Sequence, residues 1–346
     1  MNSPSRFSFK NWLQKPAGVV AGCYLALLSL MALFSPWLGN DGSPNANRQC
    51  LPCRLAAPGQ EIQFAVLLRN SPNQGNVFIG YPDPGPSIPF HEKTELRGGT
   101  LFRFNGYSGT SSQWVAADEQ YQVLSRRFVL GADPLGRDLW SRLLMGGRIS
   151  LGIGWLSVMV ALIIGITLGA LAGFIGGKID AVLSFIINLT WSVPTLLLVM
   201  TLTIALGKGW LPTFLAVGLS TWVEIARVTR AEIMGLKKRD FALAGTVLGL
   251  PAWRLIWHHI LPGIRGPLLV VAAANFAGAV LIESGLSFLG LGVQPPAPTW
   301  GNMMESHRHF LISGHLHLIL VPGLAILSVV LAFIVLGDSL KNLRRL

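Results

Sequence analysis

Charged side chains are scarce in this chain of 346 residues, since Asp, Glu, Lys and Arg make up only 12% of it. Soluble domains carry about twice that fraction, so the composition excludes an ordinary water-soluble enzyme. Hydrophobic residues make up 51% of the chain, which also excludes intrinsic disorder. Its 3 cysteines, Cys23, Cys50 and Cys53, are too few for a disulfide scaffold.

A nucleotide-binding loop is also missing. The run Gly176–Ile179 has neither the leading glycine at the required interval nor a Ser or Thr after its lysine, so it is not a Walker A motif. The apolar runs contain no Ser/His/Asp, HExxH or paired-carboxylate arrangement. We therefore do not expect an enzyme, and any ATP hydrolysis would come from a separate chain.

Long apolar runs dominate what is present. A bilayer is spanned by about 20 apolar residues, and a run near the N-terminus of that length is too long for a signal peptide. The sequence predicts an all-α integral membrane protein with six transmembrane helices in the lipid bilayer. The runs cover roughly residues 17–38, 150–173, 182–206, 210–227, 267–291 and 316–337.

Basic residues predict the orientation, because they concentrate in cytoplasmic loops. The stretch from Arg227 to Arg265 has seven basic residues against two acidic ones. The two ends of the chain are basic as well, and we expect both termini to be cytoplasmic. The net charge of +11 is thus explained by membrane loops, and no nucleic acid partner is expected. The terminal basic residues are Arg6, Lys10, Lys15, Lys341, Arg344 and Arg345.

The segment 39–130 would then lie outside the cell membrane. It is rich in Gly, Pro, Asn and Ser, and it contains short alternating or aromatic runs at Ile62–Val66, Val77–Ile79 and Leu101–Phe104. These features predict a small extracytoplasmic β-rich or irregular subdomain. In an oxidising compartment Cys50 and Cys53 favour a local disulfide. The predicted domains are 1–38, 39–130 and 131–346.

The basic loop 228–265 contains a short amphipathic segment. Its apolar residues recur at helical spacing, and Pro251 is suited to opening a second short helix. Two interpretations remain open from composition: insertion into a groove on a partner, or a helix lying on lipid headgroups. The apolar stripe consists of Leu243, Val247, Leu248 and Leu250.

This loop resembles the EAA loop of binding-protein-dependent ABC importer permeases. Leu243 replaces the usual acidic residue of that motif, and Asp240 is placed to fill its role. The resemblance implies that an ATPase docks here. The matching positions are the small pair Ala244 and Gly245, the glycine Gly249, and the closing Leu261 and Pro262.

Further motifs look like those of the C-type subunit of oligopeptide/dipeptide permeases. Gly131–Asp138 resembles the G-T-D-x-x-G-R-D signature, and Glu283–Gly301 resembles the family's E-x-x-L-S-F-L-G-L-G-x-Q-P-P run. The resemblance covers 128–346 strongly and 1–38 weakly. It implies a permease subunit in the cell inner membrane, without a cofactor, that transports peptides, with nickel as the alternative solute. It also implies as partners a second permease subunit, two cytoplasmic ATPase subunits and an extracytoplasmic solute-binding protein.

Within the predicted spans, an acidic side chain at the membrane centre costs about 2.5–3.5 kcal/mol on insertion scales. Glu283 and Glu224 should therefore face protein or water. Glu283 is the candidate for the translocation pathway, with a structural hydrogen bond as the alternative, whereas Glu224 beside Arg227 is more typical of an interface pair. Pro194 should kink the third span along that pathway.

A second function class stays open. A self-sufficient secondary transporter or channel, driven by an ion gradient, would use acidic residues in discontinuous helices, but it would leave the long basic loop without a purpose. Four histidines near the last span have no carboxylate at a defined ligand spacing, so no metal site is predicted. They are His307, His309, His315 and His317.

Overall fold

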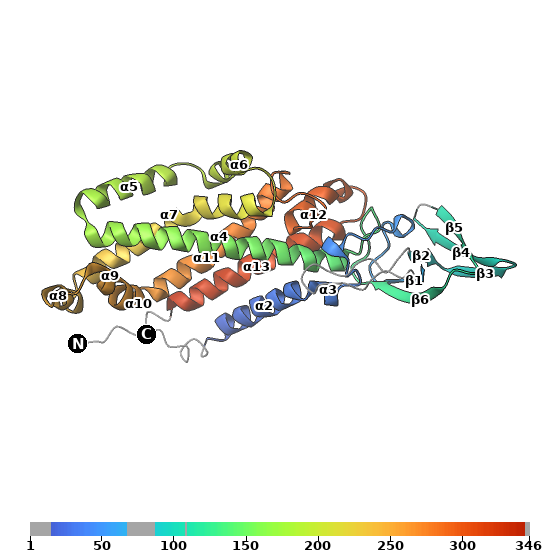
Figure 1. Ribbon diagram of the computed structural model, residues 1–346, viewed down its shortest axis with the longest axis horizontal. Coiled ribbons are helices and arrows are strands. Elements are labelled where there is room, and N and C mark those ends of the chain that lie inside the picture. Colours follow the sequence, from blue (N-terminus) through green and yellow to red (C-terminus); the bar gives the residue numbers. More distant parts are fainter. Residues whose placement is uncertain (1–14, 68–86, 108, 343–346) are drawn as a thin grey trace. The chain divides into compact units, whose positions relative to one another are not determined.

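The computed structural model describes residues 15–67, 87–107 and 109–342 (Figure 1). The predicted features at Arg6, Lys10, Val77–Ile79, Arg344 and Arg345 lie outside these residues. The chain forms two compact units. The first, here called the helical unit, comprises Met1–Leu27, Ser150–Val293 and Leu324–Leu346. The second, here called the extension unit, comprises Leu28–Ile149 and Gln294–Gly323.

In the described part of the chain, 5 helices are long and apolar enough to cross a membrane. Each coincides with one of the predicted apolar runs, although α4 and α7 extend well beyond theirs. Asp138 explains the earlier start of α4, because its carboxylate accepts the backbone N–H of Ser141 as a helix cap. The helices are α2 (Pro16–Leu33), α4 (Leu139–Ile175), α7 (Trp210–Lys237), α11 (Arg265–Phe288) and α13 (His317–Asn342).

The predicted third span is broken. It consists of α5 (Gly177–Trp191) and α6 (Thr195–Leu206), which are bent by 91° relative to each other (Figure 1). Pro194 caps α6, and its missing N–H and fixed φ prevent α5 from continuing. The predicted break at Pro194 is confirmed, but one helix through 182–206 is not found. If the bent pair counts as one span, the described residues contain up to six candidate membrane spans.

Helix α7 is the centre of the helical unit, because it packs against α5, α6 and α11. Along α4, three glycines at four-residue spacing let the two backbones approach closely. A Cβ at Gly169 would lie 2.5 Å from the carbonyl oxygen of Ala226 on α7. The other two glycines, Gly165 and Gly173, likewise face α7.

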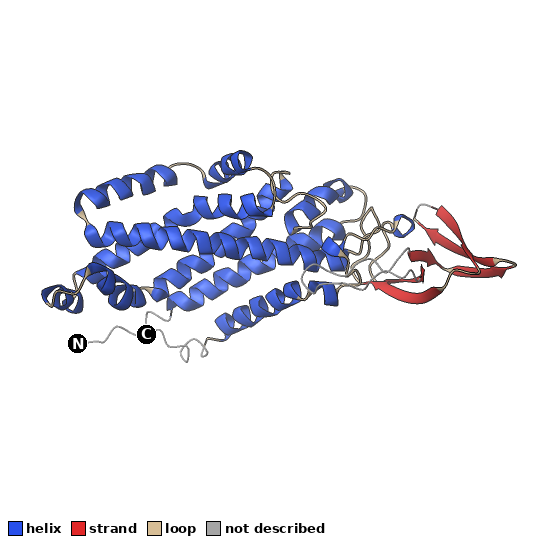
Figure 2. Cartoon of the chain, in the orientation of Figure 1, coloured by secondary structure: helices blue, strands red, loops and turns tan. Residues whose placement is uncertain are grey.

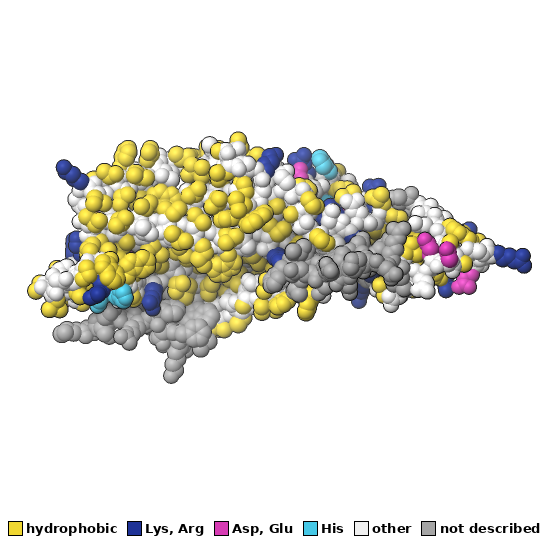
Figure 3. All heavy atoms as spheres, viewed as in Figure 1, with side chains coloured by type: hydrophobic (Ala, Val, Ile, Leu, Met, Phe, Trp, Pro, Cys, Tyr) yellow, Lys and Arg dark blue, Asp and Glu magenta, His cyan; other side chains and the backbone are white. Residues whose placement is uncertain are grey.

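Hydrophobic side chains also cover much of the outer surface of the helices. Figure 3 shows them spread over the visible face of α4 to α7. Phe185 on α5 is 66% exposed and Ile204 on α6 is 68% exposed. Because an apolar surface of this kind is unstable in water, it is suited to contact with lipid or with another membrane helix.

Short segments follow α7. They form α8 (Asp240–Val247), α9 (Ala252–Leu255), a π-helical turn (Ile256–Ile260) and α10 (Leu261–Gly263). The prediction of two short helices on either side of Gly249 is confirmed.

All strands of the described chain lie in the extension unit, so the protein is not purely α-helical (Figure 2). They form two antiparallel sheets, with orders β2-β1-β6 and β3-β4-β5. Alternation explains the first sheet, because Ile62, Phe64 and Val66 all point from β1 into one core. The strands are β1 (Gln60–Leu67), β2 (Ser87–Phe90), β3 (Glu92–Leu96), β4 (Gly99–Gly106), β5 (Gly109–Ala116) and β6 (Tyr121–Phe128).

The strands form an insertion whose two ends lie close together. The backbone N–H of Gly59 donates to Phe128 O at 2.7 Å, and the N–H of Ala132 donates to Ala56 O at 3.0 Å. The predicted disulfide between Cys50 and Cys53 is present just before the insertion. Short helices α3 (Ser35–Leu38) and α12 (Trp300–His307) complete the extension unit.

Candidate functional site

A large cavity in the helical unit lies along α5, α7 and α11. It has a volume of about 790 Å³, and a second cavity of about 200 Å³ has side chains from the same helices and from α6. Trp191, Glu224 and Ala274 line both cavities. Volumes of this size suit a small organic solute.

Glu224 is the one acidic side chain among the described residues that line these cavities. It is exposed on α7. The predicted pairing with Arg227 is not seen: in the described part of the chain no ion pair joins these residues, and the Arg227 guanidinium instead lies 4.2 Å from the ring centre of Trp191. The carboxylate of Glu224 is therefore directed to the cavity and not to a neighbouring cation.

One wall of the larger cavity is braced by an ion pair that the sequence reasoning missed. Arg230 donates from Nε and from a terminal nitrogen to the two carboxylate oxygens of Asp180, at 2.5 and 2.8 Å. This two-point geometry joins α5 to α7. The sequence offered one signal for this pair, which was Asp180. It is an acidic residue in the first turn of a helix that begins at the glycine pair Gly176 and Gly177.

The two predicted pathway residues lie elsewhere. Glu283 is completely buried, and Ser287 on its own helix donates to it at 2.8 Å. It lines neither cavity, so its contacts match the structural alternative. Pro194 is exposed at the bend, and its neighbours Val193 and Thr195 line the smaller cavity.

Four of the six predicted docking residues lie in the short helix α8 or just after its end. On α8, Ala242 and Gly245 are buried, whereas Val247 is 86% exposed. A Cβ at Gly245 would lie 2.9 Å from Leu255 of α9, so the small residue allows the two short helices to pack. Gly249 has a φ of +72°, which glycine adopts at no steric cost, and it ends the helix.

The remaining docking positions surround that packed face. Asp240 is exposed in the first turn of α8, where a carboxylate complements the helix dipole. Ala244 is exposed on the outer side, and Leu261 and Pro262 in α10 are half-buried. The structure thus places all six residues in one segment, with Gly245 as a packing residue and Asp240 and Ala244 on the accessible side.

The Gly131–Asp138 motif builds a tight loop in the extension unit. The buried carboxylate of Asp133 accepts the backbone N–H groups of Leu135 and Arg137 and pairs with Nε of Arg137 at 2.6 Å. Gly136 has a φ of +71°, and a Cβ there would overlap the carbonyl of Cys50. These residues hold the chain in shape just before α4.

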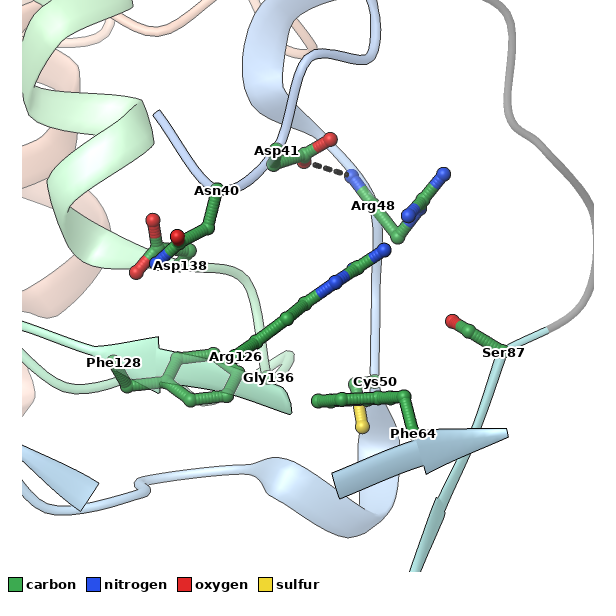
Figure 4. Close-up of a pocket in the computed structure, with 10 residues that line it drawn as sticks. All are labelled: Asn40, Asp41, Arg48, Cys50, Phe64, Ser87, Arg126, Phe128, Gly136 and Asp138. Carbon is green, nitrogen blue, oxygen red and sulfur yellow. Dashed lines mark hydrogen bonds between the residues drawn. The ribbon is translucent and has the colours of Figure 1, made fainter. Parts of the chain in front are cut away.

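A small pocket beside this loop is also lined by charged groups. Figure 4 shows Arg126 extending toward Arg48, with its guanidinium 5.2 Å from the ring centre of Phe64. The backbone N–H of Arg48 donates to Asp41 at 2.8 Å. The pocket has a volume of about 20 Å³, which suits one water molecule and is too small for an organic solute.

Metal ligation was not predicted at the four histidines. His307 lies 3.9 Å from Asp133, whereas His315 contacts Tyr107 and His317 through its ring. Among the described residues, no group of three or more His, Cys, Asp or Glu side chains is placed to hold a metal ion.

Several known proteins are similar in sequence to more than half of this chain. Residues 165–343 match the family described as binding-protein-dependent transport system inner membrane component. A di/tripeptide transport system permease protein of Pseudomonas aeruginosa is 41% identical over 240 residues, which cover 69% of this chain and 77% of that protein. A dipeptide transport system permease protein of Alkalihalophilus pseudofirmus is 36% identical over 235 residues, covering 67% and 77%.

A more distant relative and a solved structure are similar as well. An oligopeptide transport system permease protein of Bacillus subtilis is 33% identical over 239 residues, which cover 69% of this chain and 77% of that protein. A chain of the MetNI methionine ABC transporter, in an inward-facing conformation, is 18% identical with a TM-score of 0.48 and covers 59% of this chain and 95% of its own.

The resemblance of this chain to importer permeases is therefore confirmed by sequence matches that cover 67–69% of it. The family match covers just over half of the chain, and the relatives exceed 30% identity over more than two thirds of their own length. This chain belongs to the inner membrane components of binding-protein-dependent transport systems.

Proposed function

We propose that this inner-membrane chain is the permease subunit of an ATP-driven peptide importer, forms half of the translocation pathway, and is moved by a separate ATPase. The observation that carries the proposal is the arrangement on α7. One helix lines the cavities with Glu224 and is followed, after two residues, by the exposed helix α8. The relatives' own names supply the solute class, since they are permease proteins of di/tripeptide, dipeptide and oligopeptide systems.

The face of α8 supports docking of a partner. Val247 and Leu248 are 86% and 79% exposed, although both are hydrophobic. Eight residues of helix are about 12 Å long, far less than the roughly 30 Å of a bilayer core. A short apolar helix of this kind fits a groove on a partner protein, which we propose is the ATPase.

The other partners follow from the family. A second permease subunit would complete the pathway, two ATPase subunits would dock on the cytoplasmic side, and an extracytoplasmic binding protein would deliver the peptide. The basic residues around α8 support a cytoplasmic position for this segment and for both termini. Transport would proceed by alternating access, with α8 following the closure of the ATPase dimer.

The test uses the complete importer in membrane vesicles. Val247→Asp places a charge in the docking face, so we expect ATP-driven uptake of a labelled dipeptide and association with the ATPase to be lost, while the chain still inserts. The matched control is Val123→Asp on β6, an exposed valine of the extension unit. Retained ATPase association in the Val247 variant, or uptake by vesicles without nucleotide, would contradict the proposal.

A further inference from the structure

The smaller cavity of the helical unit has a wall of hydrogen-bond acceptors. The hydroxyls of Thr190, Ser220 and Thr221 each donate their hydrogen to a backbone carbonyl of their own helix, at 2.9, 2.7 and 3.0 Å. Each hydroxyl has one donor and two acceptor lone pairs. What these side chains can offer to the cavity is therefore acceptor oxygen.

Asn275 adds to the same wall. Its side-chain nitrogen donates to the carbonyl of Val271 at 3.2 Å, which leaves the side-chain oxygen as its acceptor. It lines the smaller cavity together with the three hydroxyls. Four neutral groups on three helices thus bring acceptor oxygens to this cavity.

Glu224 supplies the negative charge at this wall. It lines both cavities, is exposed, and makes no hydrogen bond or ion pair with the described residues. The cations nearby are engaged elsewhere, Arg230 with Asp180 and Arg227 with the ring of Trp191. A carboxylate within a membrane helix is costly unless it faces water or a cation.

We infer that Glu224 is the counter-ion for a primary ammonium group of the solute, which the acceptors of the smaller cavity surround. An ammonium has three N–H donors and no acceptor, so it matches one carboxylate flanked by hydroxyl and amide oxygens. A carboxylate would be repelled there by the like charge of Glu224. The inference rests on the proposed function and makes Glu224 a specificity-determining residue of the permease itself.

Two peptide groups carry this chemistry, the α-amino terminus and a lysine side chain. Three probes distinguish them: dialanine, N-acetyl-dialanine, and N-acetyl-lysyl-alanine. ATP-driven uptake of each is measured in vesicles that contain the complete importer, with wild type, Glu224→Gln, Glu224→Asp and the matched control Glu232→Gln. Glu232 is on the same helix and lines neither cavity.

A charge-assisted hydrogen bond contributes about 1.5–3 kcal/mol, which corresponds to roughly a 10- to 100-fold change. We expect Glu224→Gln to lower dialanine uptake by at least about 10-fold and to reduce the preference over N-acetyl-dialanine by a similar factor. Glu224→Asp should retain most of the dialanine uptake and of the preference over N-acetyl-dialanine, and Glu232→Gln should match wild type in both. Assembly with the ATPase should be retained in every variant, and Glu232→Gln should also retain the wild-type rate of ATP hydrolysis.

The outcomes separate this inference from the proposed function. If wild type and Glu224→Gln take up all three peptides equally and prefer dialanine equally over N-acetyl-dialanine, the role of Glu224 is overturned. The proposed function would be unaffected by that result. If only N-acetyl-lysyl-alanine uptake depends on Glu224, the ammonium is that of a side chain, which supports the counter-ion role and assigns the source. An assembled wild-type importer that takes up none of the three peptides would overturn the proposed function, and the inference with it.

Discussion

At the scale of single residues, the buried charges of the extension unit depend on one carboxylate. Asp133 accepts hydrogen bonds from two backbone N–H groups and from Arg137, and His307 and Arg142 approach it at 3.9 and 4.0 Å. A buried ion that loses its partner destabilises a fold strongly. The protonation of His307 within this cluster should therefore affect stability.

Burial lowers the pKa of the His307 imidazole to about 4, an effect that Arg142 and Arg137 reinforce and Asp133 opposes. In the unfolded chain the imidazole titrates near its ordinary value of about 6.5. Between these values only the unfolded state binds the proton, so the free energy of unfolding should fall as the pH is lowered from about 6.5 toward 4. Melting temperatures of the purified chain in detergent, measured across this range, test the expectation.

The histidine responsible is identified by substitution. The variant His307→Gln should have a shallower dependence of melting temperature on pH than wild type. His309→Gln is the control, because His309 is exposed next to it in sequence, and its curve should follow wild type. An identical slope in wild type and His307→Gln would show that other groups cause the acid sensitivity.

At the scale of elements, the contact between α4 and α7 depends on glycine. A Cβ at Gly169 would meet the backbone oxygen of Ala226 at 2.5 Å and Cβ of Thr229 at 2.8 Å. Backbone atoms cannot move aside as a flexible side chain can. The two helices would have to separate to accommodate even one methyl group.

We expect Gly169→Ala to lower the melting temperature, because overpacking costs about 1–3 kcal/mol. Gly152→Ala on the same helix is the matched control, since a Cβ there has no atom within 4 Å. Thermal unfolding followed by circular dichroism in detergent compares the two. Equal melting temperatures for the two variants would mean that the helices are less closely packed than described here.

Elements were predictable where a single residue determines them. Pro194 predicted the break between α5 and α6, and Gly249 predicted the end of α8. The backbone preferences of proline and glycine act locally, so they can be read from the sequence. The alternating residues Ile62, Phe64 and Val66 likewise announced β1. The angle of 91° at the break was not predictable, because it depends on packing against α7.

The choice between the two membrane carboxylates was also beyond the sequence. Glu224 and Glu283 both lie in apolar runs, and hydropathy does not tell which face of a helix borders a cavity. The structure buries Glu283 beside Ser287 and exposes Glu224. The ion pair of Asp180 was missed because its partner Arg230 is 50 residues away in sequence.

At the scale of the whole molecule, the β insertion has its entry and exit side by side. Because Gly59 and Phe128 are joined by a backbone hydrogen bond of 2.7 Å, a very short linker can replace the strands between them with little loop-closure cost. The family match at 165–343 also lies outside this segment. The helices should therefore fold without it.

We expect a chain in which Gly-Ser-Gly replaces residues 60–128 to insert into the membrane and to keep its association with the ATPase. The membrane fraction, helical circular dichroism and co-purification with the ATPase provide the measurement. The Val247→Asp variant of the same shortened chain is the control that should lose the ATPase. Aggregation of the shortened chain in place of insertion would show that the strands are needed for folding.

Helix α7 carries Glu224 and ends at Lys237, and only two residues separate it from α8. Thirteen residues of helix measure about 20 Å, and no proline interrupts them. A helix is stiff along its axis, so a push on α8 would reach the carboxylate at nearly full amplitude. The ATPase and the solute would then be coupled through one continuous helix, α7. Each closure of the ATPase dimer would displace Glu224, the residue that we infer binds the solute.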